Sequence, residues 1–253
     1  REPAFGLAAW WIDHNQRSRA EAMNFTVVEP TSVVATHLSE VVKSHAAELL
    51  TRDEVANLIE GLKQRAPKLV EEAIPGIVKP GDVQRILQSL LRERVPIRDM
   101  ETIVEALAEW APKTKDHDVL IEYVRHALRR AICQQYASPE PDGRLRLACI
   151  TLDPAFEDQV NAYIDRGPGG TTFAMPAATA EQLTSQVRKA MEKLTGRGHP
   201  PVVVASPQVR GVVRQMLTER IPGVAVLGYN EVSTGVEVET LALVTPPKAT
   251  AAA

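Results

Sequence analysis

Apolar residues recur three or four positions apart through most of residues 31–135, which is the spacing of helices with one buried face. The first such segment, residues 33–50, predicts a helix that begins at a cap formed by Thr31 or Ser32. The side chains of its apolar stripe are Val34, Leu38, Val41, Val42, Ala46 and Leu49.

Residues 51–135 predict a series of helices separated by prolines. Thr51 and Glu54 have the spacing of a capping box, so we expect a helix from there to about Arg65. Four more helical patterns follow in PKLVEEAIPG, PGDVQRILQSLLRERV, IRDMETIVEALAEWAP and DHDVLIEYVRHALRRAICQQY. In two of them the side chains expected to face the core are Val83, Ile86, Leu87, Leu90, Leu91, Ile103, Val104 and Leu107. The short loops predict that consecutive helices pack as neighbours.

The pattern changes at residues 138–143, where SPEPDG combines prolines, polar residues and an Asp-Gly pair. Beyond it, RLRLACITL alternates like a strand, and helical patterns cover residues 153–165 and 179–195. The strand-like runs PVVVAS, VAVLGY and GVEVETLALV and the helical PQVRGVVRQMLTERI complete the segment. This alternation predicts a small α/β unit after the helical one. A separate β-branched run, FTVVE at 25–29, predicts a short strand.

The composition argues against several functional classes. The chain of 253 residues has a net charge of −3, a pI of about 6.1 and 4% aromatic residues, which argues against a nucleic-acid surface. No apolar run approaches the ~20 residues of a membrane span, and no signal peptide is evident. The chain starts with REPAFGLAAWW and has no initial Met, which predicts that it is a piece of a longer protein. At the other end, residues 246–253 predict a disordered tail. Cys133 and Cys149 predict buried thiols in a reducing compartment.

Two His-x-x-Glu pairs, His37/Glu40 and His45/Glu48, raise the question of a metal site. On one helix, eight positions place the two histidines roughly 80° apart, so the pairs do not converge. A di-iron carboxylate site also needs Glu-x-x-His in that order, on several facing helices. The pairs therefore predict a solvated helix face with i,i+3 contacts and no metal.

Other motifs also favour structural roles over catalysis. RGPGGTT lacks the Lys-Ser/Thr ending of a phosphate-binding loop, so Gly169 and Gly170 predict a flexible surface loop. Ser206 before Pro207 resembles a helix cap without GxSxG surroundings, and Asp99 lies in the first turn of a helix, where an acid is favoured. The basic HALRR run favours a helix C-terminus. Because no acid, base and nucleophile converge, we expect neither an enzyme nor a cofactor site.

One apolar cluster at the start of the chain has two interpretations. Such a cluster forms part of a core, or it stays exposed beside polar residues and marks a partner-binding site. The sequence leaves both open. Its members are Phe5, Leu7, Trp10, Trp11, Val27, Val28 and Val33.

Five ordered blocks resemble the C-terminal cytoplasmic region of the flagellar type III export-gate proteins, the FlhA family. They are EPAFGLAAWWI, FTVVEPTSVVATHLSE, HAAELLTRDEV, PKLVEEAIPG and VPIRDMETIVEALAEWAP. The resemblance covers residues 1 to about 135 nearly without gaps. It continues more loosely through PPVVVASPQVRGVVRQML and GVAVLGYNEV. The sequence VVATHL resembles flagellar members of the family more than their injectisome relatives.

This resemblance implies an α+β fold of several subdomains, with remnants of two mixed α/β subdomains before a central all-α helical subdomain and a small α/β one. The implied boundaries are 1–29 for the remnant of the second cytoplasmic subdomain, 30–49 for the end of the first, 50–135 for the helical third, 136–245 for the α/β fourth and 246–253 for the tail.

The resemblance further implies a docking platform for protein export. Such proteins form a nine-subunit ring beneath the secretion channel, in the cytoplasmic portion of a bacterial inner-membrane protein. The ring docks flagellar export chaperones with filament-type substrates, and it contacts the export ATPase complex and the companion switch protein. We therefore expect these partners, ring self-association, no nucleic acid, no cofactor and no metal.

The resemblance also implies a hydrophobic chaperone pocket between the first two subdomains. The residues that match its acid, its Phe, its Thr and its apolar wall are Glu2, Phe5, Thr36, Leu7, Val28 and Val33. Glu2 stands where the family usually has Asp, which keeps the charge but lengthens the side chain. The helix over 33–50 would then border a docking pocket.

Two alternatives stay open. In the first, the chain is a structural ring subunit whose main role is self-assembly, with little affinity for chaperones. In the second, it is a metal-dependent enzyme, which folding in chelator and an elemental analysis without metal would exclude.

Overall fold

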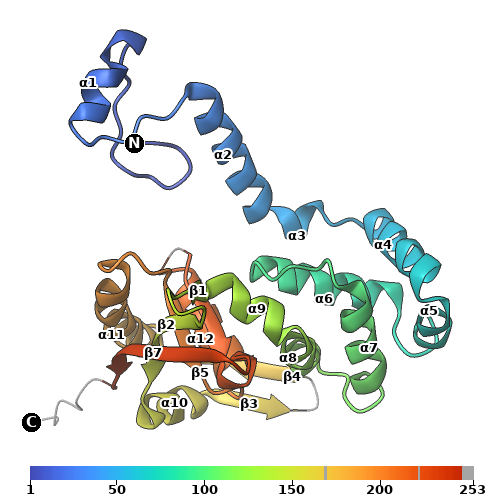
Figure 1. The fold of residues 1–253 in the computed structure, drawn as a ribbon. Helices are drawn as coiled ribbons and strands as arrows, with labels where there is room; N and C mark the ends of the chain where they lie inside the picture. The colour runs from blue at the N-terminus through green and yellow to red at the C-terminus, as the bar shows by residue number, and fades with distance from the viewer. Residues whose placement is uncertain (168–169, 222, 247–253) are drawn as a thin grey trace, which may run out of the picture.

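The computed structural model describes residues 1–167, 170–221 and 223–246. An N-terminal arm leads into a row of helices, which lie beside a sheet that carries helices of its own (Figure 1). Within these ranges, none of the helices is both long and apolar enough to cross a membrane. The predictions for Gly169 and for the tail residues 247–253 lie outside the described residues.

The arm contains short helices joined by irregular chain. They are η1 (His14–Gln16), α1 (Arg17–Ala22), α2 (Pro30–Ser44) and α3 (Ala46–Leu49). The predicted cap at Thr31 or Ser32 is wrong, because α2 begins at Pro30 with Glu29 as N-cap, and the fixed φ of proline suits the first helical position. The predicted single helix over 33–50 is interrupted at His45, whose φ of −104° and ψ of 9° are not helical.

The predicted strand at 25–29 is also wrong. These residues have no regular secondary structure, and they pair with no other described segment. A β-branched run becomes a strand only where a neighbouring strand accepts and donates its backbone hydrogen bonds. Instead Asn24, with a φ of 62°, turns the chain between α1 and this connection.

Six helices follow the arm. They are α4 (Arg52–Arg65), α5 (Pro67–Ala73), α6 (Pro80–Arg92), α7 (Met100–Trp110), α8 (His117–Ala127) and α9 (Arg129–Tyr136). The cap at Thr51 is confirmed, since its Oγ1 accepts a hydrogen bond of 3.2 Å from the Glu54 amide. Asp99 caps α7 in the same way through the Thr102 amide, at 3.1 Å. The last predicted helix is divided into α8 and α9 at Leu128.

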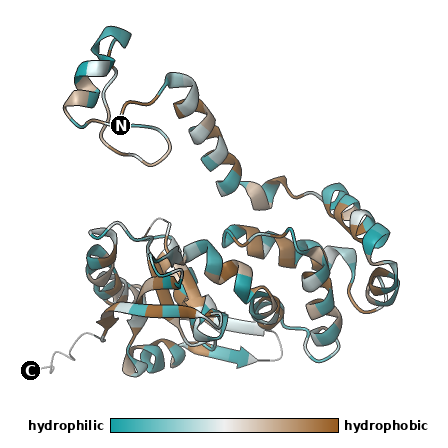
Figure 2. Ribbon diagram, in the orientation of Figure 1, coloured by the Kyte–Doolittle hydropathy of each residue, from teal (hydrophilic) through white to brown (hydrophobic). Residues whose placement is uncertain are grey.

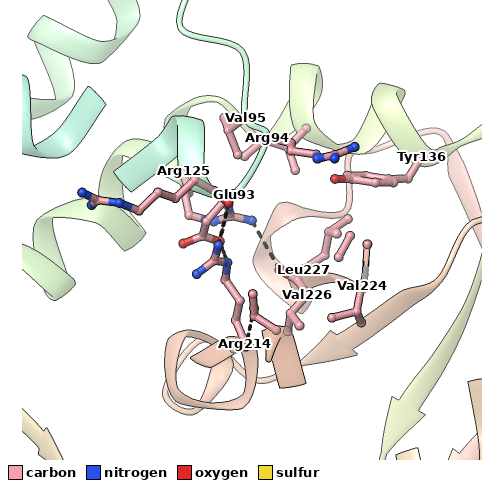
Figure 3. A pocket seen from close by; sticks show the side chains of 14 residues that line it. Glu93, Arg94, Val95, Arg125, Tyr136, Arg214, Val224, Val226 and Leu227 are labelled. Carbon is pink, nitrogen blue, oxygen red and sulfur yellow. Dashed lines mark hydrogen bonds and ion pairs between the residues drawn. The ribbon is translucent and has the colours of Figure 1, made fainter. Parts of the chain in front are cut away.

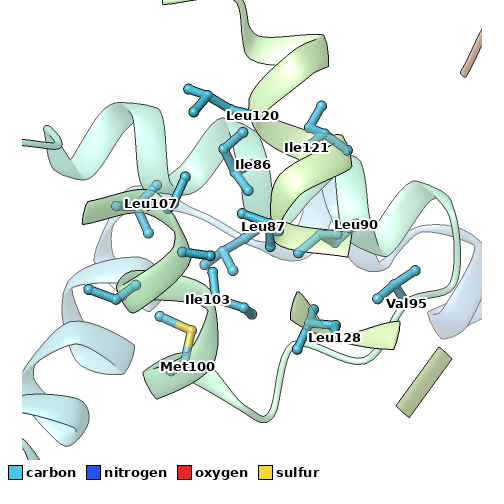
Figure 4. Packing of buried hydrophobic residues seen from close by; sticks show 14 of the residues in the cluster. Ile86, Leu87, Leu90, Val95, Met100, Ile103, Leu107, Leu120, Ile121 and Leu128 are labelled. Atoms are coloured by element: carbon cyan, nitrogen blue, oxygen red, sulfur yellow. The ribbon is translucent and has the colours of Figure 1, made fainter. Parts of the chain in front are cut away.

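The apolar stripes of α6, α7 and α8 meet in one core, as Figure 4 shows for Ile86, Leu87, Ile103 and Leu107. Burial of one such side chain contributes roughly 1.5–3 kcal/mol, so these contacts stabilise the packing of the three helices. The predicted inward residues of α6 and α7 are confirmed, apart from Leu91, which packs against the core while partly exposed.

The remainder of the chain forms the sheet and its helices. They are β1 (Ser138–Pro139), β2 (Leu145–Leu152), α10 (Pro154–Asn161), β3 (Ile164–Gly167), β4 (Gly170–Phe173), α11 (Ala177–Thr195), β5 (Val202–Ala205), α12 (Arg210–Thr218), β6 (Ala225–Gly228), η2 (Tyr229–Glu231) and β7 (Val236–Val244). β2, β5, β6 and β7 are parallel, in the spatial order β7-β2-β5-β6. The short β1 pairs antiparallel with the start of β2.

The strand β2 is covered on both faces. Leu147 and Cys149 belong to the helical core, whereas Ala148, Ile150 and Leu152 belong to a second core with α10, α11 and α12. Successive side chains of a strand point to opposite faces, so one strand serves both cores. The helical unit and the α/β unit therefore share the sheet as a common wall.

The segment RGPGGTT does not form the expected loop throughout. Ile164 pairs with Phe173 and Gly167 pairs with Gly170 in an antiparallel hairpin of β3 and β4. The flexible-loop prediction is therefore wrong for Gly170, which is in a strand with a φ of 107°.

Candidate functional site

The predicted pocket residues lie on the arm, where their apolar side chains are exposed. Phe5 and Leu7 are each 64% exposed and Val28 is 52% exposed, while Val33 is only partly buried and Thr36 is exposed. Figure 2 shows hydrophobic residues along α2 and the connection that precedes it. The arm therefore presents apolar surface that no other part of the described chain covers.

Glu2 organises the turn that carries Phe5 and Leu7. Its carboxylate accepts hydrogen bonds from the backbone amides of Ala4 (2.8 Å), Phe5 (2.5 Å) and Leu7 (3.2 Å), and its own amide donates to the Leu7 carbonyl at 2.9 Å. Gly6 closes the turn with a φ of 71°, which favours glycine. Desolvation alone would raise the pKa of Glu2, but these amides outweigh it and lower that pKa. The acid thus holds the turn, a role that the sequence did not reveal.

The second group of pocket residues belongs to α2. Val33 and Thr36 are three positions apart, so they share a face of the first turns of this helix. Arg17 of α1 forms ion pairs with Glu21 and with Glu29, which ties α1 to the start of α2. Among the described residues, no hydrogen bond or ion pair joins the Glu2 turn to α2.

In this chain the N-terminal aromatic cluster is exposed and is not part of either hydrophobic core. Trp10 and Trp11 are 77% and 82% exposed, and α2 has no buried residue. Exposed apolar side chains also extend beyond the predicted pocket. These include Met23, Phe25, Val34, Leu38, Val41 and Val42. Exposed apolar side chains gathered on one segment are typical of a binding interface.

Polar contacts fix the arm to the helical unit. Glu40 of α2 lies 2.7 Å from Lys43 and 3.3 Å from Arg94, and the hydrogen bond from Lys43 comes first among the causes that lower its pKa. Gln84 and Gln88 of α6 both donate to the Leu50 carbonyl, at 3.0 and 3.2 Å. The arm is therefore held at its base by contacts of α2 and of Leu50.

The His-x-x-Glu pairs do not build a metal site. His37 lies on α2 whereas His45 lies between two helices, and Glu40 engages basic residues instead. Only His45 and Glu48 approach each other, at 3.3 Å. No group of three or more potential metal ligands occurs within the described ranges. Cys133 and Cys149 are buried as predicted, and burial raises the pKa of the Cys149 thiol to about 11.

A buried ion-pair network joins the helical unit to the α/β unit. Arg125 of α8 is 2% exposed and pairs with Glu231 (2.6 Å) and Glu93 (2.9 Å). Arg210 of α12 is 1% exposed and pairs with Glu93 (2.7 Å) and with Glu122. Burial alone would raise the pKa of Glu93, but Arg210 and Arg125 hold it below its usual value.

Sequence reasoning missed this network. Its partners come from positions up to 117 residues apart, so no local pattern connects them. The one available signal was Arg125, a charged residue beside Val124 on the buried face of α8. A charge buried there requires a carboxylate partner from elsewhere.

Two cavities border the network. Figure 3 shows one of about 130 Å³ between Arg125, Tyr136, Arg214 and the edge of β6. The other is an open groove of about 1030 Å³ between α8, α12 and the β3–β4 hairpin.

The chain is similar to flagellar proteins in sequence. Residues 1–237 match the FHIPEP family. The flagellar biosynthesis protein FlhA of Bacillus subtilis is 37% identical over 243 residues, with 96% of this chain and 35% of that protein aligned. FlhA of Caulobacter vibrioides is 40% identical over 246 residues, with coverages of 96% and 34%. The chain thus spans about a third of the length of these relatives.

The fold is similar to solved structures of secretion proteins. Chlamydia pneumoniae CdsV has a TM-score of 0.83 at 26% identity, with 95% of this chain and 68% of that chain covered. Nonameric EPEC SctV-C has a TM-score of 0.78 at 28% identity, with coverages of 91% and 68%. A complex of CdsV and CdsO gives 0.82 at 26% identity, with coverages of 92% and 67%.

Proposed function

Because the chain belongs to the FHIPEP family of flagellar and type III export components, we propose that it is a cytoplasmic docking platform of a flagellar type III export gate. In this role it binds export chaperones that carry filament-type substrates. The export ATPase complex and the companion switch protein are further partners of the proposed platform, which belongs to a protein of the bacterial inner membrane.

The exposed apolar surface of the arm carries this proposal. Phe5 and Leu7 project from a turn that the Glu2 carboxylate holds, and Val28, Val33 and Thr36 lie at the start of α2. An amphipathic chaperone helix buries such side chains, and each square ångström of apolar surface removed from water contributes about 25 cal/mol. The turn is preorganised by hydrogen bonds, which lowers the entropic cost of binding.

A site-specific crosslink tests the proposal. A photoreactive phenylalanine analogue placed at Phe5, in the longer cytoplasmic region that contains this chain, should crosslink to a purified chaperone–filament protein complex. The same analogue at Tyr229, which is exposed on η2 away from the arm, is the matched control. Equal crosslinking at both positions, or none at Phe5, would contradict docking on the arm.

Ring assembly is the second candidate function. The structural neighbours SctV-C and the EscV cytosolic domain are nonameric, with TM-scores of 0.78 and 0.74 to this chain. A ring subunit without docking activity would form oligomers as its concentration rises, yet would not crosslink to chaperones through Phe5. Sedimentation velocity over a concentration series measures oligomer formation, and the Phe5 crosslink measures chaperone docking.

A further inference from the structure

The groove of about 1030 Å³ lies across the junction of the helical and α/β units, away from the arm. Helix α8 supplies one wall, and α12 with the loop before it supplies another. The β3–β4 hairpin closes one side, because Thr171 bonds to the α8 cap Asp116 at 3.2 Å and Arg166 donates to the Gln208 carbonyl at 2.7 Å. The hairpin is thus anchored to both units, and the groove is a built feature of their junction.

The accessible charge of this groove is mainly positive. Arg92 and Arg166 are exposed, and among the described residues no carboxylate lies within ion-pair distance of either. Within the described ranges, the hydrogen bonds of Arg166 go to neutral oxygens, those of Asn161 and Gln208. The exposed acid of the groove is Asp118, on the α8 wall.

The other two carboxylates of the groove do not offset these arginines. Glu93 and Glu122 are turned toward buried arginines, because Glu93 pairs with Arg210 and Arg125 and Glu122 pairs with Arg210. Beside them, burial and the neighbouring Arg210, Arg125 and Arg92 lower the pKa of Arg214 in spite of Glu93. Arg214 is itself partly exposed in the groove, and its Nε lies 3.3 Å from Glu93.

The lining also contains apolar side chains. Val119 and Phe173 are partly exposed in the groove, and Pro207 is exposed at its rim. At about 1030 Å³ the groove exceeds the usual 300–1,000 Å³ of a small-molecule pocket. Its size and its mixed apolar and basic lining suit a segment of polypeptide that carries carboxylates beside an apolar face.

We propose that this groove is a second docking surface, which binds an acidic amphipathic segment of a partner protein. Arg92 and Arg166 pair with the carboxylates of that segment, and Phe173 contacts its apolar face. The site is independent of the chaperone surface on the arm, because the two surfaces share no residue.

Fluorescence anisotropy tests this surface on the full chain. The probe is a labelled synthetic peptide of about 14 residues, roughly four helical turns, with leucines on one face and glutamates on both flanks. It should bind saturably at low salt and release as salt is added. The variant Arg92→Glu/Arg166→Glu should weaken binding about tenfold or more, since like charges then face each other.

Matched controls separate the groove from general electrostatics. Arg98→Glu/Arg130→Glu makes the same change of net charge at exposed arginines outside the groove, and it should alter binding by less than about twofold. The neutral variant Arg92→Gln/Arg166→Gln gives a second measurement if charge reversal impairs folding. Equal loss in the groove and control variants, or no binding of the peptide up to about 1 mM, overturns the proposal. Tighter binding of a polyphosphate or RNA oligomer than of the peptide overturns it as well.

Discussion

Arg210 and Glu93, 117 positions apart in the chain, are joined by a 2.7 Å hydrogen bond between Nη1 of the arginine and Oε2 of the glutamate. Glu93 is the C-cap of α6, and Arg210 opens α12, so this bond crosses from the helical unit to the α/β unit. Arg125 adds a second bridge from α8 to Glu231 of η2. The buried pairs and the shared face of β2 together hold the two units as one platform behind the arm.

Removal of the Glu93 charge should destabilise the protein strongly. Glu93→Gln leaves Arg210 and Arg125 buried with fewer counter-charges, which typically costs about 3 kcal/mol or more of unfolding free energy. Chemical denaturation followed by circular dichroism measures this change. Glu109→Gln, which removes an exposed pair with Lys113, is the control and should cost less than about 0.5 kcal/mol. Equal effects of the two variants would contradict the stabilising role of the network.

Acid should weaken the same network. The folded-state pKa of Glu93 lies below its usual value of 4.5, so the folded state binds this proton more weakly than the unfolded state does. The contribution of Glu93 to stability is therefore full above pH 4.5 and is lost as the pH falls through its lower folded-state pKa. Burial raises the pKa of Glu122, so the contribution of Glu122 to stability falls as the pH increases, opposite to that of Glu93.

The comparison with Glu93→Gln isolates this residue from Glu122. The stability difference between wild type and variant should be constant near neutral pH and should shrink below pH 4.5. Denaturation at a series of pH values measures it. A difference that does not change with pH would contradict the assignment.

Glycine at position 94 should give a more stable protein than alanine at that position. Arg94 has a φ of 56° at the end of α6, where the amides of Arg94 and Val95 bond to the carbonyls of Leu91 and Leu90, each at 2.9 Å. Only glycine adopts this conformation without steric cost, so Arg94→Gly should be about 1 kcal/mol more stable than Arg94→Ala. Both variants lose the ion pair with Glu40, which cancels in the comparison. Thermal unfolding with equal midpoints for the two would contradict the prediction.

Glu2 should act through the conformation of its turn. Glu2→Ala removes the acceptor of three backbone amides, so hydrogen exchange at Ala4, Phe5 and Leu7 should become faster. Chaperone binding should weaken by roughly fivefold, because part of the entropic cost of ordering the turn then falls on binding, while the unfolding midpoint stays unchanged. Glu48→Ala, at an exposed acid elsewhere on the arm, is the control. Weaker binding without faster exchange would instead indicate a direct contact between Glu2 and the partner.

Elements with strong local signals were predictable from the sequence. The cap at Thr51 and the apolar spacing of α6 and α7 each depend on residues within a few positions, and the structure confirms them. Asp99, expected in the first turn of α7, lies one position earlier as its N-cap. The candidate pocket residues came from the resemblance to the FlhA family. The structure places them on an exposed arm, and their binding role stays a prediction.

The remaining features depend on distant partners. The run at 25–29 has strand propensity but no neighbouring strand, so it is irregular. The alternation of β2 did not reveal two buried faces, because the helical unit covers the second one. The burial of Arg125 depends on Glu231, which lies 106 positions away in the sequence.

Calorimetric titration tests the central claim most directly. The longer cytoplasmic region that contains this chain is titrated with a purified chaperone–filament protein complex, as wild type, as Phe5→Ala and as Leu243→Ala. Leu243 is a matched control because it is 55% exposed, close to the 64% of Phe5, and lies on β7 away from the arm. Docking on the arm predicts saturable binding that Phe5→Ala weakens by about tenfold or more and Leu243→Ala leaves unchanged. Equal binding by all three proteins would place the chaperone elsewhere, and the absence of binding by the folded wild type would contradict the docking function itself.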